Sequence, residues 1–263
     1  MKIKIGIYQY KIKNESLSTK INKLEKVIKK NSSCDLLIVP ELYLSGYGNE
    51  KVIKKLQEKR GGKYSKLIAN LCKKYATAIL YGYPEQYQNK LFNAVQFINH
   101  QGEVLANHRK SMLPLSSKEN LIFDKGSKQT LITYKGLKIG IVICYELEFP
   151  ELVRKLALKG AQLILAPTAQ SIHWPAASRY IARSRAFENG VYVSYANFIG
   201  KQHGVEFLGE SKIIGPDGLD LTNAKKKETV ITSIIDTAAI TQVRKKMPYL
   251  EDIQFFNEIS QLY

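Results

Sequence analysis

Three ionisable side chains stand at the ends of apolar runs in this sequence, where they could do chemistry together. Glu41 follows the run LLIVP, Lys110 lies in NHRKSMLP, and Cys144 follows IGIVI. An ionisable group at the end of a buried strand costs desolvation free energy unless it has a partner. A thiol, a carboxylate and an ammonium are the nucleophile, the base and the oxyanion-stabilising cation that acyl transfer needs.

Each of these three residues also has an interpretation without chemistry. Cys144 alone could be a small hydrophobic core residue. Glu41 could cap the turn after its strand, and Lys110 could be one more lysine whose ammonium reaches solvent. No histidine is suitably placed in these stretches, so a carboxylate would have to take the thiol proton. The hypothesis of a reactive site therefore depends on the three residues occurring together.

The cysteine count argues against a disulfide or zinc scaffold. A chain of 263 residues buries enough surface to be stable without such crosslinks. Cys34, Cys72 and Cys144 form no CxxC pair and no cluster with histidine, and their number is odd. Cys34 and Cys72 are therefore expected to be structural.

The sequence predicts a cytoplasmic protein with no membrane partner. No apolar run approaches the roughly 18 residues of a membrane span. The opening MKIKIGIYQYKIKNES alternates apolar and polar residues like a strand and lacks the continuous apolar region of a signal peptide.

The strongly basic composition is interpreted as a solvated surface. The formal net charge is +17, and lysine and arginine together number 40, of which only seven are arginine. Proteins that bind nucleic acids tend to concentrate charge on one face and to use arginine for bidentate contacts. Here the lysines are spread from end to end, so no nucleic-acid partner is expected.

Apolar periodicity predicts strands and helices that alternate along the whole chain. Short apolar or alternating runs indicate strands, and apolar stripes at helical spacing indicate helices. Pro150 near the first turn and Gly160 at the end bound the helix after Cys144. The expected strands are 2–8, 35–41, 76–85, 89–99, 99–110, 131–144, 161–167, 190–197, a hairpin over 211–221, and 228–236. The expected helices are 16–30, 64–76, 150–160 and about 176–189.

The order of these elements predicts an α/β fold with two similar halves. The hairpin at 93–110 has a counterpart at 211–222, one in each half of the chain, and no linker rich in Pro or Ser divides them. We expect two sheets packed face to face with helices outside, as a single domain over 1–263. The last segment, about 244–263, is apolar and aromatic enough that we expect it to pack on a partner subunit.

Three segments resemble the signature segments of the nitrilase, or carbon–nitrogen hydrolase, superfamily. They are VPELYLSGY (39–47), HRKSMLP (108–114) and VICYELEFPE (142–151), in that order. The resemblance extends from IGIYQ near the start to MPYLED near the end. It implies the four-layer α-β-β-α sandwich of that superfamily.

The resemblance also implies a role for each reactive residue. Glu41 matches the general base of the superfamily, Lys110 its oxyanion-stabilising lysine and Cys144 its nucleophile. The stretch ENLIFDKG fits a further pattern of the superfamily and implies that Glu119 positions the lysine and the substrate nitrogen. Without that pattern, Glu119 could be a surface glutamate in a charged loop.

The implied reaction cleaves an amide in two halves. Cys144 attacks the amide carbonyl while Glu41 takes its proton, and Lys110 and the backbone N–H of Tyr145 hold the oxyanion. Glu41 then protonates the departing ammonia, and water releases the acid from the thioester. This chemistry implies no metal and no organic cofactor.

The residues around the nucleophile resemble the branch that acts on small aliphatic or amino-acid-type carboxamides. Nitrile-cleaving members typically carry Cys-Trp-Glu, whereas this chain has Cys-Tyr-Glu. N-carbamoyl hydrolases and nitrilases with the same triad remain alternatives. A catalytically silent binding protein on this scaffold is an alternative from another class.

Five residues are expected to contact the substrate, although two of them need comment. Glu146 stands where amidase-like members usually carry Asp, and Trp174 could instead pack its loop down. The expected contacts are Tyr47, Tyr145, Glu146, Ala169 and Trp174.

The helix expected at about 176–189 carries three arginines. Arg179, Arg183 and Arg185 could meet a substrate carboxylate or a partner subunit, but solvated helix charges are the default interpretation. The superfamily commonly forms dimers through the face that carries the helices after the nucleophile. The resemblance therefore implies a homodimer or a larger homo-oligomer.

Overall fold

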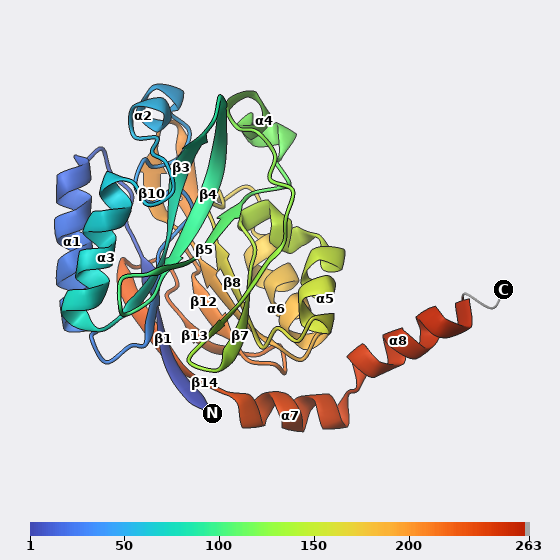
Figure 1. Ribbon diagram of the computed structural model, residues 1–263. Helices are drawn as coiled ribbons and strands as arrows, with labels where there is room; N and C mark the ends of the chain where they lie inside the picture. Colours follow the sequence, from blue (N-terminus) through green and yellow to red (C-terminus); the bar gives the residue numbers. More distant parts are fainter. Residues whose placement is uncertain (261–263) are drawn as a thin grey trace.

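Two six-stranded sheets form the centre of the computed structural model, which describes residues 1–260 (Figure 1). The first has the strand order β14-β1-β2-β3-β4-β5 and the second the order β13-β12-β9-β8-β7-β6. In the first sheet β1, β2 and β3 are parallel, and in the second β7, β8 and β9 are parallel. Antiparallel strands flank both groups in matching positions. The prediction of an α/β fold with two similar halves is confirmed.

The bounds of the elements follow the predicted alternation closely. The strands are β1 (Lys2–Gln9), β2 (Leu36–Ile38), β3 (Ala78–Tyr87), β4 (Lys90–Ile98), β5 (Val104–Arg109), β6 (Thr130–Tyr134), β7 (Leu137–Ile141), β8 (Leu163–Pro167), β9 (Tyr192–Ala196), β10 (Ile199–Gln202), β11 (Val205–Leu208), β12 (Lys212–Ile214), β13 (Asp220–Asn223) and β14 (Thr229–Asp236). The helices are α1 (Leu17–Lys30), α2 (Glu50–Lys55), α3 (Lys63–Tyr75), α4 (Glu119–Ile122), α5 (Pro150–Leu158), α6 (Ala182–Phe187), α7 (Thr237–Lys246) and α8 (Tyr249–Ser260). Shorter helical turns are η1 (Leu115–Ser117), η2 (Cys144–Glu148) and η3 (Ala177–Ile181).

Apolar side chains on both faces of each sheet produce four layers. Successive residues of a strand point to opposite faces. Ile5 of β1 and Ile141 of β7 belong to one buried cluster, which therefore fills the space between the sheets. On the outer faces, Leu24 of α1 and Ile68 of α3 pack on the first sheet, and Leu156 of α5 packs on the second. The expected α-β-β-α sandwich is present.

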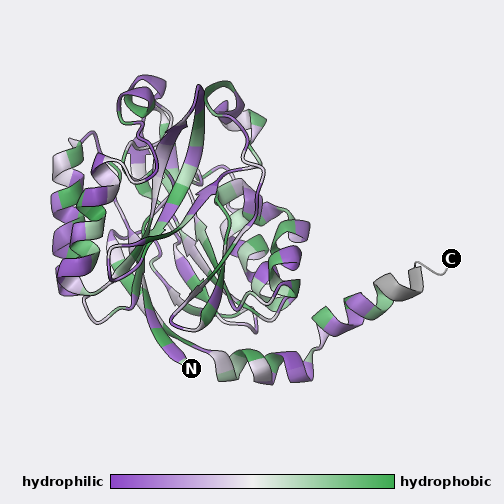
Figure 2. Cartoon of the chain, in the orientation of Figure 1, coloured by the Kyte–Doolittle hydropathy of each residue, from purple (hydrophilic) through white to green (hydrophobic). Residues whose placement is uncertain are grey.

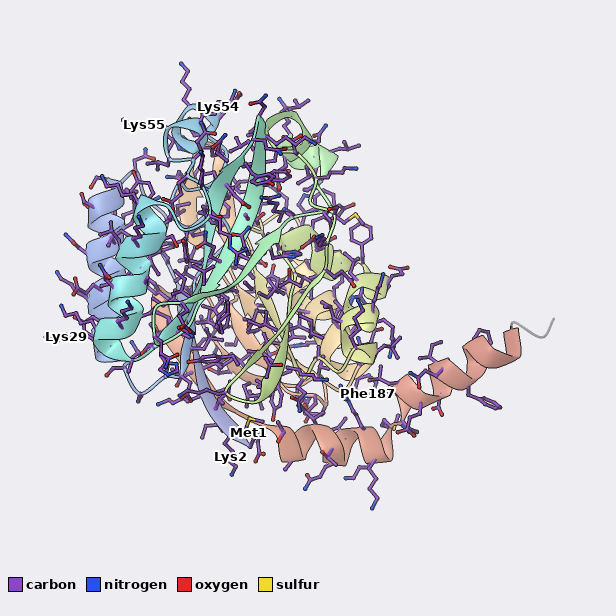
Figure 3. The ribbon with its side chains drawn as sticks, viewed as in Figure 1. Met1, Lys2, Lys29, Lys54, Lys55 and Phe187 are labelled. Atoms are coloured by element: carbon purple, nitrogen blue, oxygen red, sulfur yellow. The ribbon has the colours of Figure 1, made fainter. Side chains whose placement is uncertain are left out.

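The surface of the outer helices is polar, as the composition predicts. Figure 2 shows hydrophilic residues alternating with apolar ones along α1 and α3. Lys29, Lys54 and Lys55 project outward from α1 and α2 (Figure 3). These lysines belong to the solvated surface of the first half of the chain.

Three predicted elements differ from the structure. The run 131–144 is not one strand, because Lys135 and Gly136 adopt positive φ angles of 46° and 77° and form the turn between β6 and β7. The strand expected at 35–41 ends at Ile38, and the proline that follows has no N–H for a ladder. The helix expected at about 176–189 begins as the π-helical turn η3. The sequence patterns also do not predict α2, α7, α8 or the β10–β11 hairpin.

Helix α7 packs on the sandwich through the buried Ile240, and α8 leads away from it (Figure 1). Tyr249, at the start of α8, contacts Phe187 edge to face with ring centroids 5.6 Å apart. Phe255 and Phe256 further along α8 are 64% and 62% exposed. Residues 261–263 of the segment expected to bind a partner lie outside the described residues. Within the described chain, no helix has the length and apolar character that crossing a membrane requires.

The carboxyl ends of four strands meet at one edge of the two sheets. Because β4 is antiparallel to both β3 and β5, β5 runs in the same direction as β2 and β3. Glu41 follows β2, and its backbone N–H donates to the carbonyl of Thr168, which follows β8 in the other sheet. Lys110 and Cys144 follow β5 and β7. Ligand sites of open α/β sheets form at this kind of edge.

Gly82 of β3 allows the turn that carries Glu41 to cross the sheet closely. A Cβ atom at this position would lie 2.9 Å from the carbonyl carbon of Glu41 and 3.0 Å from its Cα, and closer still to the backbone nitrogen of Leu42. Real Cβ atoms do not approach backbone atoms this closely, so any side chain at position 82 would displace the turn.

Gly82→Ala is therefore expected to destabilise the protein. Overpacking typically costs about 1–3 kcal/mol, which lowers the melting temperature of a chain of this size by roughly 2–10 °C. Gly61→Ala is the control, because its site is open and only its φ of 72° opposes a side chain. Thermal unfolding measures both, and a Gly82 variant no less stable than the Gly61 variant would contradict this account.

Candidate active site

A fully buried lysine lies between two carboxylates at the centre of the site. Lys110 Nζ donates to Glu41 Oε1 at 2.7 Å and to the two carboxylate oxygens of Glu119 at 2.8 and 2.9 Å. Burial alone would lower the pKa of the Lys110 ammonium, but the two carboxylates raise that pKa well above its usual range. The lysine is therefore a permanent cation at neutral pH.

Asn93 and Tyr47 complete the ring of hydrogen bonds around this lysine. Asn93 Nδ2, on β4, donates to Glu41 Oε1 at 2.6 Å and to Glu119 Oε2 at 3.2 Å. The Tyr47 hydroxyl donates to Glu119 Oε1 at 2.5 Å. Asn93 belongs to none of the sequence motifs described above. Its only signal is an amide within the apolar stretch LFNAVQF, where a buried polar group needs a partner.

Glu41 keeps one carboxylate oxygen available. Its Oε2 is buried and has no hydrogen-bond partner in the described part of the chain. Burial raises the pKa of the Glu41 carboxyl, and the ammonium of Lys110 offsets only part of that effect. A carboxylate with a raised pKa and a free oxygen can accept a proton, as a general base must.

Cys144 is held in a strained backbone conformation beside these charges. It is the first residue of η2, its φ is 50°, and its side chain is half-buried with Sγ 3.8 Å from Gln170 Oε1. Burial raises the pKa of the Cys144 thiol, the negative charge of Glu41 adds to the rise, and Lys110 opposes it. The thiol is therefore protonated at neutral pH, and it needs a base to become a nucleophile.

The positive φ of Cys144 is a backbone feature that agrees with a functional role for this residue. Residues other than glycine rarely adopt this left-handed conformation, and where they do the strain is often concentrated at active sites. Sequence patterns alone do not reveal it, because Cys144 ends an ordinary apolar run.

Glu146 lies in an internal network of hydrogen bonds. Its side chain is 1% exposed, and both oxygens accept from groups of the protein itself. His108 Nε2 lies 2.8 Å from Oε2, and the Ser111 hydroxyl donates to Oε1 at 2.5 Å. Burial would raise the pKa of Glu146, but His108 and the donors at Ser111 lower it to about 2. The histidine of the HRK segment thus pairs with Glu146.

Of the other expected substrate contacts, Ala169 and Tyr145 lie next to Cys144, whereas Trp174 does not lie in the buried cluster. Ala169 is buried, and a backbone hydrogen bond from it reaches Cys144 and lowers the pKa of that thiol. The ring of Tyr145 packs edge to face on Phe149 with centroids 4.9 Å apart. Trp174 is 61% exposed in the loop after β8, so the structure does not bring it into the buried cluster.

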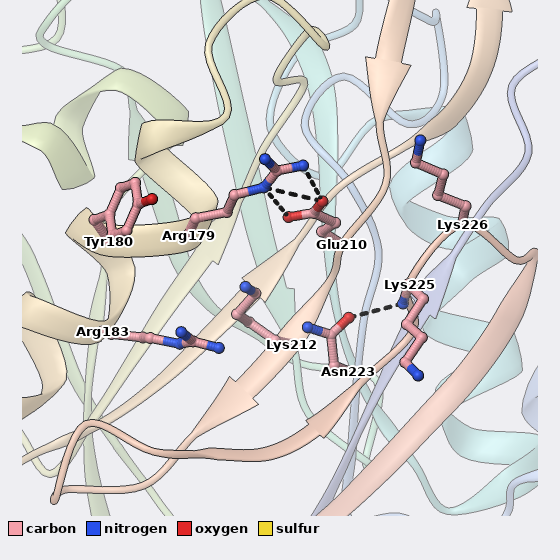
Figure 4. A pocket seen from close by; sticks show the side chains of 8 residues that line it. All are labelled: Arg179, Tyr180, Arg183, Glu210, Lys212, Asn223, Lys225 and Lys226. Atoms are coloured by element: carbon pink, nitrogen blue, oxygen red, sulfur yellow. Dashed lines mark hydrogen bonds and ion pairs between the residues drawn. The ribbon is translucent and has the colours of Figure 1, made fainter.

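The three arginines of η3 and α6 all have partners within the chain. Arg179 pairs with Glu210 and Arg183 with Asp220. Figure 4 shows the first pair in a basic surface groove of about 470 Å³, which also contains Lys212 and lies apart from the Lys110 cluster. Arg185 donates to backbone carbonyls of the segment after Cys144.

Cys34 and Cys72 are both buried free cysteines. Among residues 1–260, no group of three or more His, Cys, Asp or Glu side chains is arranged to hold a metal ion.

The chain belongs to the carbon–nitrogen hydrolase family, whose profile matches residues 4–245. A Pseudomonas protegens protein described as the hydrolase in the pqqF 5′ region is 36% identical over 253 residues, which cover 95% of this chain and 88% of that protein. The 2-oxoglutaramate amidase of Bacillus subtilis is 29% identical over 97% of this chain and 98% of its own length. The solved structure of Saccharomyces cerevisiae Nit3, a member of branch 10 of the nitrilase superfamily, aligns with a TM-score of 0.85 at 26% identity over 94% of each chain.

These similarities confirm the resemblance found in the sequence. The protein is a carbon–nitrogen hydrolase of the nitrilase superfamily, with the fold of that superfamily and with relatives named as amidases. The family match covers both sheets and every residue of the cluster around Lys110.

The lowered pKa of Glu146 predicts a loss of stability in acid. The carboxyl titrates near 4.5 when unfolded and near 2 when folded, so its contribution is complete above about pH 5 and decreases as the pH falls toward 2. Urea unfolding should show wild type more stable than Glu146→Gln, with the difference shrinking by roughly 1–2 kcal/mol between about pH 6 and pH 3.5.

Glu50→Gln is the control for this prediction, because Glu50 is exposed and pairs only with Lys54 on the same helix. Its difference from wild type should change little over the same range. A constant difference for the Glu146 variant would contradict the buried network.

Proposed function

We propose that this protein hydrolyses the non-peptide C–N bond of a small carboxamide to the acid and ammonia through a thioester on Cys144. The observation that carries the proposal is the buried Lys110 ammonium, which contacts Glu41 at 2.7 Å and Glu119 at 2.8 Å while Glu41 keeps one oxygen free. This arrangement provides a base and an oxyanion-stabilising cation next to a protonated thiol. We further propose that the enzyme acts in the cytoplasm.

In the first half of the proposed reaction, the thiol adds to the amide carbonyl. Glu41 takes the proton of Cys144 as Sγ bonds to the carbonyl carbon, and the π electron pair moves to the oxygen. Lys110 and the backbone N–H of Tyr145 stabilise that oxyanion. The buried site favours this stabilisation, because charge interactions are stronger where water is excluded.

The second half returns the enzyme to its starting state. The tetrahedral adduct collapses, the C–N bond breaks, and Glu41 gives its proton to the departing nitrogen, which leaves as ammonia. A water molecule then loses a proton to Glu41 and attacks the thioester. The C–S bond breaks, the acid departs, and the Cys144 thiolate regains its proton from Glu41.

Glu119 has a positioning role in this proposal. Its two oxygens hold the ammonium of Lys110, and Tyr47 and Asn93 donate to the same carboxylate. The orientation of the lysine is thereby fixed before the substrate arrives, which avoids reorganisation during the reaction. We propose Tyr47, Tyr145 and Ala169 as the residues nearest the bound amide.

An amide is the substrate class that the relatives support. Besides the 2-oxoglutaramate amidase, a Pseudomonas protein named as an (R)-stereoselective amidase is 27% identical over 83% of this chain. Carbamoyl compounds and nitriles would use the same triad, so the experiment below separates them from amides.

Ammonia release from a panel of small amides, carbamoyl amino acids and nitriles tests the proposal. Wild type should turn over at least one amide, and Cys144→Ala should reduce the rate by more than about 10³-fold. Cys72→Ala is the matched control, since Cys72 is a buried cysteine outside the site. Activity confined to carbamoyl compounds or nitriles would change the substrate class. A folded wild type that is silent on the whole panel would contradict the proposal and favour a binding role.

We also propose that the protein is at least a homodimer and that the segment from about residue 244 packs on the partner. α8 leaves the sandwich with Phe255 and Phe256 more than half exposed (Figure 1). Exposed aromatic pairs of this kind mark surfaces that other chains cover.

The double variant Phe255→Asp/Phe256→Asp should therefore shift the protein toward monomer in light scattering coupled to size-exclusion chromatography. The variant would place two charges in the proposed interface instead of two aromatic rings. Aromatic contacts often contribute much of the binding free energy of an interface. Leu219→Asp, at an exposed leucine of the β12–β13 turn, is the control and should not change the mass. A wild type that is already monomeric would refute this proposal.

A further inference from the structure

One carboxylate connects the backbone next to the lysine with the backbone next to the cysteine. Glu146 Oε1 accepts from the Ser111 backbone N–H at 2.7 Å and from the Ser111 hydroxyl at 2.5 Å. Glu146 Oε2 accepts from the Ile143 backbone N–H at 2.7 Å. Ser111 directly follows Lys110, and Ile143 directly precedes Cys144. The two segments come from different sheets.

We infer that Glu146 is a positioning residue, which fixes the Lys110 ammonium relative to the Cys144 thiol and does not itself bind substrate. This inference rests on the proposed function of those two residues. All the hydrogen bonds described for the carboxylate go to the protein, and its side chain is 1% exposed. It therefore has no free face to offer a ligand.

His108 also holds the carboxylate, through the same oxygen that accepts from Ile143. Its ring is 3% exposed, with Nε2 2.8 Å from Glu146 Oε2 and Nδ1 3.0 Å from the hydroxyl of Thr130. Because Glu146 is ionised and can only accept, Nε2 is the donor. Both ring nitrogens are thus engaged, and His108 supports the position of Glu146 rather than acting as a base for the thiol.

A second residue holds the other end of the nucleophile turn. Arg185, on α6, donates from Nε to the Leu147 carbonyl at 3.0 Å and from Nη2 to the Glu148 carbonyl at 2.7 Å. The strained φ of Cys144 therefore lies between two anchored segments: Ile143 before it, held by Glu146, and the backbone at 147–148 after it, held by Arg185. Strained residues persist only where the surroundings fix them in this way.

The length of the Glu146 side chain matters for this role. It must reach Ser111 with one oxygen and Ile143 with the other, across the gap between two sheets. Aspartate would keep the charge but shorten the reach by one C–C bond, about 1.5 Å. Glutamine would keep the length but replace one accepting oxygen with an NH₂ donor, which would face another donor.

The experiment compares Glu146→Gln and Glu146→Asp with wild type on the amide that wild type turns over. We expect Glu146→Gln to lower kcat by roughly 10²-fold with KM within about threefold, because a displacement of about 1 Å in a reacting group has such an effect. Glu146→Asp keeps acceptors at both oxygens but shortens the reach, so its kcat should lie between those of wild type and Glu146→Gln.

Glu58→Gln is the matched control. Glu58 is another carboxylate that accepts two backbone N–H groups, from Tyr64 and Ser65 in the first turn of α3, and it makes no hydrogen bond to the Lys110 cluster among those described. All assays are made below the melting temperature of the least stable variant. Glu58→Gln should lose stability and keep its kcat within about threefold of wild type.

If Glu146→Gln does not fold, Ser111→Ala tests the same connection. It removes one hydrogen bond and leaves the backbone contact in place, so kcat should fall by roughly threefold to tenfold with KM unchanged.

Three results would overturn the inference. One is a folded Glu146 variant with wild-type kcat, and another is a rise in KM at constant kcat, which would indicate substrate binding. The third is an equal loss of kcat in Glu58→Gln, which would indicate a general effect of stability. If wild type itself shows no turnover that depends on Cys144, the proposed function fails, and that result is distinguishable from all three.

Discussion

The buried ammonium of Lys110 is the interaction on which the rest of the site depends. A cation without solvent is tolerated only because Glu41 and Glu119 surround it, and those two carboxylates are tolerated only because the cation is there. Removing the lysine would leave two buried carboxylates with no cation to compensate them. Burial within this cluster raises the pKa of Glu41, and one of the Glu41 carboxylate oxygens has no partner in the described part of the chain. Stability and reactivity in this protein are therefore properties of one set of hydrogen bonds.

The fold of the sandwich brings these charged residues together from distant parts of the chain. Parallel strands in each sheet direct their carboxyl ends to one edge, and the close crossing at Gly82 brings Glu41 across β3. The large apolar cluster between the sheets sets their distance. Glu146 then connects the two sheets next to the reacting groups, so the geometry of the site does not depend on apolar packing alone.

Much of the fold could be predicted from the sequence, because apolar periodicity indicates which faces are buried. Much of the candidate site could also be predicted, because its residues lie in segments that resemble a known superfamily: Glu41, Lys110, Glu119 and Cys144. What the sequence does not reveal are partnerships across large separations. Asn93 and the His108–Glu146 pair carry no local pattern, since their significance lies in contacts with residues 26 to 52 positions away. The β6–β7 hairpin within 131–144 is not predicted for a related reason, because its turn depends on positive φ angles at only two residues.

The formal charges around Lys110 do not cancel. The two carboxyl groups of Glu41 and Glu119 and the single ammonium of Lys110 give the buried cluster a formal net charge of minus one. In the proposed reaction, a neutral amide would enter this field without penalty, whereas the carboxylate formed from it would carry the same sign as the cluster. Like charges at short range repel strongly in such surroundings. For the proposed hydrolysis, the electrostatic arrangement that holds the lysine would thus also favour departure of the acid and disfavour inhibition by accumulated product.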